Sequence, residues 1–202
     1  ALTLLWAASP ARAHVVANGV GAQSELRVSP RRVELRFNLG FSSLLGLGQL
    51  KRMDQNEDGY VDAEEEERYL GVLIEELRPH LKLTLDGKPL ELRVVEQRGL
   101  GILGPIEQVG FDTWYELVAE VELGAGEHEL RYLDGSGEVF ANENSEHLLW
   151  VIEGEGRFER SRISQERPAG PPKHTNEPGV HGLLGSDLRW GFAFNGEALA
   201  DD

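Results

Sequence analysis

Alternation of apolar and polar residues runs through much of the chain and predicts β-strands. Over residues 32–38, Val33, Leu35 and Phe37 share one face while charged and polar residues occupy the other. This pattern is typical of a strand with one buried face. The same two-residue period recurs over residues 81–85, 90–94, 115–123 and 128–132. Asp86-Gly87 predicts a hairpin between the first two of these segments, and the glycine turn at residues 124–126 predicts one between the last two.

Two further parts of the chain, residues 148–152 and the segment after residue 168, complete the predicted set of strands. Residues 148–152 are apolar throughout and predict a central strand covered on both faces. Residues 168–182 are rich in Pro, Gly and His and predict a loop or linker, and the segment that follows predicts a final strand with Phe192 and Phe194 in the core. We expect a mainly β domain over residues 14–167, an antiparallel β-sandwich of immunoglobulin-like topology with one α-helical insert at about residues 43–78. Residues 168–202 would hold the linker and the final strand.

The insert has helical periodicity on both sides of an acidic loop. Leucines and a methionine at residues 44–53 predict a short helix, and residues 62–77 predict a longer one whose apolar face contains Tyr69, Leu70, Leu73 and Leu77. Pro79 ends the second helix. Between them, residues 54–65 read Asp-Gln-Asn-Glu-Asp-Gly-Tyr-Val-Asp-Ala-Glu-Glu, which matches a complete EF-hand calcium loop.

Each metal-ligating position of that loop holds a suitable residue. Positions 1, 3, 5, 7, 9 and 12 are Asp54, Asn56, Asp58, Tyr60, Asp62 and Glu65. Position 7 contributes a backbone carbonyl and position 12 a bidentate carboxylate. Gly59 stands at the sixth position, where the sharp turn requires glycine, and Val61 fills the apolar eighth position.

The residue types point to Ca²⁺ as the ion. Four carboxylates in one loop repel one another unless a cation lies between them, and the paired oxygens of Glu65 favour the large coordination shell of Ca²⁺ over the octahedron of Mg²⁺. The alternative is an acidic turn before a solvated helix, but such a turn has no reason to match every ligand position and the glycine together. Since the sequence holds no second EF-hand loop, the rest of the domain or another chain must brace this one, or it binds weakly.

Composition limits the other functions of the chain. Its 202 residues carry a formal net charge of −15, which argues against a nucleic-acid surface and against anionic membrane surfaces. The chain has no cysteine, so no disulfide can stabilise an exported fold and a bound Ca²⁺ could take that role. No cysteine nucleophile, Gly-x-Ser-x-Gly or His-Glu-x-x-His motif is present, so we do not expect an enzyme.

The first thirteen residues resemble the second half of a secretion signal. An apolar segment over residues 2–8 is followed by Ala11-Arg12-Ala13, the small-x-small pattern that precedes signal-peptidase cleavage. Cleavage there would leave His14 as the N-terminus and place the domain in the periplasm or outside the cell. The alternative is an apolar first strand.

The order of these features resembles a known family. A signal that ends before a His, a calcium loop followed by an Ala- and Glu-rich helix, and the segment LKLTLDGKPLELRVV together resemble the N-terminal extracytoplasmic domain of bacterial nickel and cobalt permease-like membrane proteins, including hydrogenase and urease accessory relatives. The resemblance covers roughly residues 14–133, with His14-Val15 where the family usually has His-Pro. It implies a membrane-protein partner or a C-terminal transmembrane region, with the calcium loop on the same six residues.

These observations leave two functional hypotheses. The first is an exported accessory or binding domain in which Ca²⁺ neutralises the loop carboxylates, orders the two helices and fixes the insert against the sheet. The second is a periplasmic carrier of Cu²⁺ or Ni²⁺ that uses the free amine and imidazole of His14, with His174 and His181 as further ligands; a solvated terminal His is the simpler interpretation. His128 alternates with Leu130 and Tyr132, which favours a core-facing, hydrogen-bonded His over a metal ligand.

Overall fold

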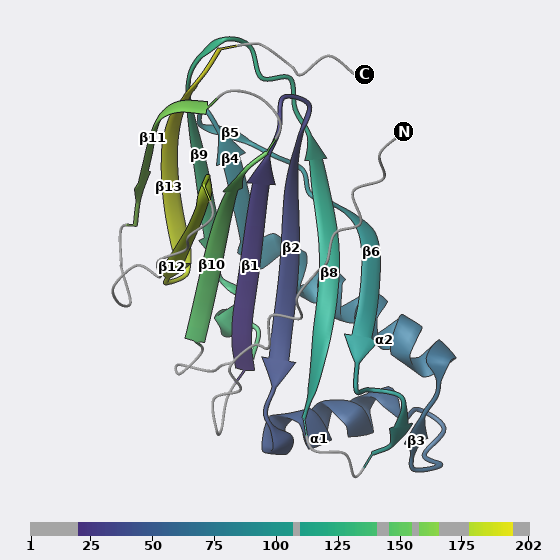
Figure 1. The fold of residues 1–202 in the computed structure, drawn as a ribbon. Helices are drawn as coiled ribbons and strands as arrows, with labels where there is room; N and C mark the ends of the chain where they lie inside the picture. The colour runs from purple at the N-terminus through teal and green to yellow at the C-terminus, as the bar shows by residue number, and fades with distance from the viewer. Residues whose placement is uncertain (1–19, 107–109, 141–145, 155–157, 166–177, 196–202) are drawn as a thin grey trace.

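Two stacked β-sheets form the body of the protein (Figure 1). The computed structural model describes residues 20–106, 110–140, 146–154, 158–165 and 178–195. The six-stranded sheet has the order β12 (Val180–Leu184), β10 (Glu146–Glu153), β1 (Val20–Val28), β2 (Arg32–Phe41), β8 (Phe111–Glu120) and β6 (Arg93–Leu100). The five-stranded sheet has the order β11 (Phe158–Ser164), β13 (Asp187–Phe194), β9 (Gly126–Asp134), β4 (Leu81–Leu85) and β5 (Lys88–Pro89). The predicted β-sandwich with a helical insert is therefore confirmed.

The core lies between the two sheets and follows the predicted alternation. Val33, Leu35 and Phe37 of β2 are fully buried, as are Trp190 and Phe192 of β13. The Trp190 ring centroid lies 4.8 Å from that of Phe192, in a tilted arrangement that is favourable for aromatic pairs. Every second side chain on these strands thus points into one shared apolar layer.

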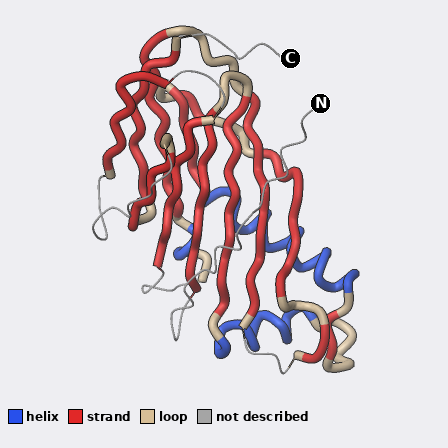
Figure 2. Tube along the Cα trace, viewed as in Figure 1, coloured by secondary structure: helices blue, strands red, loops and turns tan. Residues whose placement is uncertain are grey.

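The helical insert lies between β2 and β4 in the chain. It comprises α1 (Ser43–Met53), the short strand β3 (Tyr60–Val61), α2 (Ala63–Leu77) and the 3₁₀ turn η1 (Arg78–His80) that contains Pro79. Figure 2 shows the two helices grouped together, away from the turn between β1 and β2. The apolar face of α2 is buried, with Tyr69, Leu70, Leu73, Ile74 and Leu77 in the core. No helix in the described part of the chain is long and apolar enough to cross a membrane.

Of the two predicted hairpins, the one at Asp86-Gly87 forms but is shorter than predicted, and the one at residues 124–126 is wrong. β4 and β5 pair across Asp86-Gly87 at Lys88 and Pro89, and the Leu90 N–H still donates to the Leu83 carbonyl at 2.9 Å. The chain then crosses to the other sheet, where β6 pairs with β8. Likewise β8 and β9 lie in different sheets, because residues 121–123 hydrogen-bond to the turn between β1 and β2 instead of returning along β8. A turn signal marks a reversal of the chain but does not determine which sheet receives the next strand.

Other expectations need smaller corrections. β1 and β10 pair in parallel, so the sandwich is not wholly antiparallel; the two strands are distant in sequence, and no short turn fixes their direction. Among the β10 residues whose burial is described, Leu149 and Val151 are buried and the others are partly buried, so this strand lies inside its sheet but is fully covered on one face. The sheets continue past residue 167 through β12 and β13, and η2 (Ser136–Glu138) follows β9. The immunoglobulin-like topology stays a prediction.

Candidate metal centre

The loop between α1 and α2 brings all six predicted ligand residues into one short segment. α1 ends at Met53, and the N–H of Asp54 still donates to the Leu50 carbonyl at 3.0 Å. α2 begins after Asp62, whose Oδ1 accepts hydrogen bonds from the N–H groups of Glu64 and Glu65, both at 2.9 Å. In return Glu65 Oε2 accepts from the Asp62 N–H at 3.2 Å. This capping box fixes the helix start and holds two predicted ligands in place.

Side-chain oxygens in the first half of the loop organise its backbone. Asp54 accepts from the N–H groups of Asp58, at 3.1 Å to Oδ1, and Gly59, at 3.0 Å to Oδ2. Asn56 Oδ1 accepts from the Asp58 N–H, and Asp58 Oδ1 accepts from the Tyr60 N–H, both at 2.9 Å. The chain thus curls around its own carboxylate and amide oxygens, as in Asx turns.

Gly59 has the backbone conformation that the sixth position requires. Its φ is +84°, in the left-handed region where a side chain is penalised. A Cβ added there would meet no heavy atom within 4 Å, so the backbone conformation and not crowding explains the glycine.

Two loop carboxylates, those of Asp54 and Glu65, are buried. Asp54 is 8% exposed and Glu65 is 5% exposed. Glu65 Oε1 accepts from the N–H groups of Gln55 at 2.8 Å and Asn56 at 3.3 Å, which joins the end of the loop to its start. Within the described residues no Lys, Arg or His forms an ion pair with either carboxylate. Because buried charges are normally paired or bound to metal, these two groups fit a cation site.

The carboxylates do not, however, converge as a finished coordination shell. Across the described residues no three His, Cys, Asp or Glu side chains come together in an arrangement that could hold a metal. Asn56, Asp58 and Asp62 are exposed, and the Tyr60 side chain points to solvent with 58% exposure. Each carboxylate offers about four lone-pair positions, so an oxygen that accepts an N–H keeps the capacity to bind a cation. The donor types and the loop conformation fit Ca²⁺, but in this structure the donor oxygens do not point to one common position.

Sequence reasoning missed the connection between β6 and β8. Its short strand β7 (Gly104–Pro105) pairs with β3 of the loop, and the Ile106 N–H donates to the Gly59 carbonyl at 3.1 Å. Beside this pair a hollow of about 570 Å³ is lined by Leu47, Lys51, Gly59, Tyr60, Pro105 and Ile106. The glycines at positions 99, 101 and 104 were the available signal of an unusual turn.

The histidines of the described residues form no metal site. His128 Nδ1 lies 2.8 Å from Asp86 Oδ2, and its Nε2 lies 2.8 Å from the Gly124 carbonyl. Its ring contacts Phe192, with centroids 5.7 Å apart, so the prediction of a hydrogen-bonded, core-facing His is confirmed. His181 lies on β12 opposite Val151 and is exposed. His14 and His174 lie outside the described residues.

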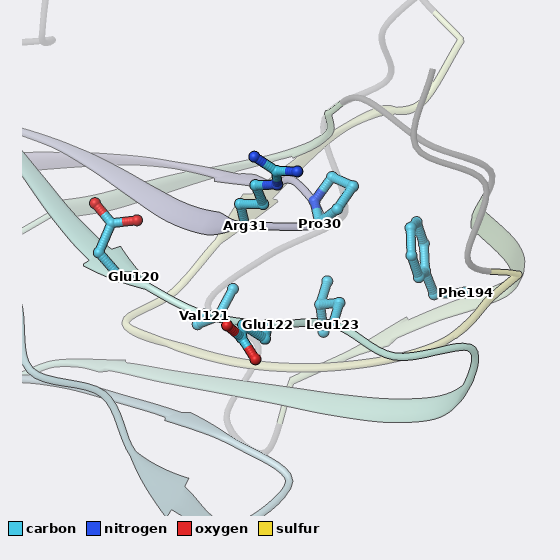
Figure 3. A pocket seen from close by; sticks show the side chains of 7 residues that line it. All are labelled: Pro30, Arg31, Glu120, Val121, Glu122, Leu123 and Phe194. Atoms are coloured by element: carbon cyan, nitrogen blue, oxygen red, sulfur yellow. The ribbon is translucent and has the colours of Figure 1, made fainter. Parts of the chain in front are cut away.

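A second hollow, of about 720 Å³, lies beside the turn between β1 and β2 (Figure 3). Arg31, Glu120 and Glu122 supply its charges, and Phe194 lies at one side. Pro30, Val121 and Leu123 complete its lining. It is distant from the calcium loop, and its mixture of charged and apolar side chains points to no particular chemistry.

Comparison with known proteins does not assign this site. The chain matches no protein-family model, and no curated protein is similar to it. The functional argument therefore depends on the loop and its surroundings.

Proposed function

We propose that this protein is a calcium-binding accessory domain in which one Ca²⁺ ion stabilises the fold. The observation that carries the proposal is the EF-hand loop in which Asp54 and Glu65 are buried without a cationic partner among the described residues. Asp54, Asn56, Asp58, Tyr60, Asp62 and Glu65 would hold the ion. Bound there, it supplies positive charge between four carboxylates that otherwise repel one another.

Contacts between the two helices favour a structural role over that of a sensor. Tyr69 donates its hydroxyl proton to Gln49 Oε1 at 2.7 Å, and Arg52 donates to Glu76 Oε1 at 2.8 Å. These bonds join α1 to α2, and the buried face of α2 holds the pair against the sheets. A wide opening of the helices would break both bonds and expose core residues, so binding should order the loop without opening the helices.

The proposed setting is the periplasm or the exterior of the cell. Steady, high calcium there suits a structural site, and a chain without cysteine must be stabilised by something other than disulfides. The resemblance to the extracytoplasmic domain of nickel and cobalt permease-like proteins suggests a membrane protein as partner. We propose binding, without catalysis, as the role of the domain.

Calorimetric titration of Ca²⁺ into the protein, with melting curves in EDTA and in Ca²⁺, tests the proposal. We expect one site, and stabilisation of about 2.7 kcal/mol when free Ca²⁺ reaches about 100 times the Kd. Glu65→Gln keeps an oxygen for the loop N–H groups but removes the bidentate charge, so binding should be lost or greatly weakened.

Glu67→Gln is the matched control, because it removes the same charge from an exposed neighbouring residue. It should retain binding with only a small decrease in affinity at low salt. Absence of heat and of stabilisation in the unmodified protein would refute the proposal.

A further inference from the structure

The end of β6 and the connection from it to β8 contact the calcium loop on both sides of its last ligands. β7 pairs with β3, with Pro105 opposite Tyr60 and Gly104 opposite Val61. The Gly99 N–H donates to Glu66 Oε1 at 2.8 Å, immediately after the predicted bidentate ligand. Two segments far apart in the chain thus meet at this loop, through the pairing of β3 with β7 and the bond between Glu66 and Gly99.

The shape of this connection is closely fitted to the loop. Gly101 and Gly104 have φ values of +76° and +119°, a conformation that favours glycine. A Cβ on Gly99 would lie 2.1 Å from Ile102 Cδ1 and 2.7 Å from Glu66 Oε1. Ile102 and Val61 are almost fully buried, at 1% and 2% exposure. The connection therefore anchors the apolar eighth position of the loop in the core.

Residues 99–106 also occupy the backbone edge of β3, through which a second EF-hand loop would otherwise pair with this one. The backbone of Val61 lies opposite Gly104, and the Gly59 carbonyl accepts from the Ile106 N–H. Because that bond flanks the pair, Tyr60 and Pro105 are a non-hydrogen-bonded pair, and the Tyr60 carbonyl that the seventh position offers to a metal points away from β7. The pairing therefore leaves this oxygen available.

We propose that residues 99–106 replace a second EF-hand: they position the loop for metal binding and set the calcium affinity of the single site. The inference rests on the proposed function, because it concerns the same site. Its physical basis is preorganisation. A loop whose backbone is already held at Gly59 and Val61, and whose next residue Glu66 is held through its side chain, loses less conformational freedom on binding. Glu66 and Gly99 are thus positioning residues and not ligands.

Comparing the calcium affinities of Glu66→Ala and Glu66→Gln measures how much the bond between Glu66 and Gly99 contributes to binding. Both variants remove the same charge, but only alanine removes the acceptor of the Gly99 N–H. Binding is measured by calorimetry and by Tb³⁺ luminescence sensitised through Tyr60, with melting curves in EDTA to verify folding. We expect Glu66→Ala to bind roughly tenfold more weakly than Glu66→Gln, the scale of one hydrogen bond between a charged acceptor and a partly buried backbone donor. Glu67→Ala, at an exposed neighbour, should match Glu67→Gln.

Gly99→Ala provides an independent measurement from the other side of the contact. Its matched control is Gly48→Ala, where an added Cβ meets nothing within 4 Å. Gly99→Ala should weaken binding, and Gly48→Ala should not. If the unmodified protein binds calcium but Glu66→Ala and Glu66→Gln bind equally, the role of residues 99–106 is refuted while the proposed function stands. If the unmodified protein binds neither Ca²⁺ nor Tb³⁺, both fail.

Discussion

Replacing Gly59 by alanine measures the cost of the left-handed turn in the calcium loop. The added Cβ would meet no heavy atom within 4 Å, so the change introduces no clash. Its φ of +84° is unfavourable for an L-residue with a Cβ, by about 1–2 kcal/mol. The Gly59 N–H can still donate to Asp54 Oδ2, because alanine keeps that donor. The decrease in the free energy of unfolding should therefore equal the cost of placing alanine in the left-handed conformation.

Gly48→Ala makes the same chemical change with the opposite expected sign. Gly48 lies within α1, and its added Cβ also meets nothing within 4 Å. Alanine is favoured over glycine in a helix interior by about 0.8–1 kcal/mol. The two variants should therefore differ by roughly 2–3 kcal/mol in free energy of unfolding, with Gly59→Ala below the unmodified protein and Gly48→Ala above it.

Urea denaturation in EDTA is the assay, because it separates folding from any contribution of bound calcium. Thermal unfolding should agree, at about 2–4 °C per kcal/mol for a chain of this length. If Gly59→Ala proved as stable as Gly48→Ala, the loop would not need a left-handed residue at position 59. In Ca²⁺ the deficit of Gly59→Ala should increase, since an altered turn would also bind the ion less well.

Three further changes test other parts of the structure. Burial lowers the pKa of His128, but bonds to Asp86 and a backbone carbonyl outweigh this and leave its pKa raised. The contribution of His128 to the free energy of unfolding, measured in urea, should therefore be complete below about pH 6.5 and decrease as pH rises through the raised pKa. The His128→Gln variant should lack this pH dependence. Burial also raises the pKa of Asp112, so Asp112→Asn should be more stable than the unmodified protein at neutral pH, and the gain should vanish as pH falls through that pKa toward about 3.9. Tyr132→Phe removes a 2.9 Å bond to Ser24 Oγ and should cost about 1 kcal/mol, with the double variant carrying Ser24→Ala costing less than the sum of the single changes.

Local patterns in the sequence predicted the elements well because each reflects one physical constraint. The alternation of Val33, Leu35 and Phe37 predicted β2, since a strand with one buried face needs an apolar residue at every second position. The spacing of oxygen-bearing residues around Gly59 predicted the loop between two helices, and the positive φ of Gly59 agrees with it. Neither inference depends on which distant segment covers the element.

Pairing between distant strands could not be predicted in the same way. The glycine turn at residues 124–126 correctly marks the start of β9, but the chain had already left β8, with the Val121 N–H donating to the Arg31 carbonyl at 2.9 Å. The parallel pairing of β1 and β10 has no local signal either, because it depends on how both sheets are assembled. The partly buried face of β10 follows from that assembly and not from its apolar sequence.

The early end of the hairpin after β4 and the residues missed at the metal centre have one cause. If residues 90–94 had returned along β4 as predicted, the strand would have stayed in the five-stranded sheet. Instead the chain leaves β4 after Leu90 and forms β6 beside β8, in contact with α2. Only this crossing brings Gly99 to Glu66 and Gly104 to Val61. The ligand residues thus lie within twelve consecutive positions and can be found from sequence. The segment that braces them can contact the loop only because the chain crosses to the other sheet after β5, and no local sequence pattern predicts that crossing.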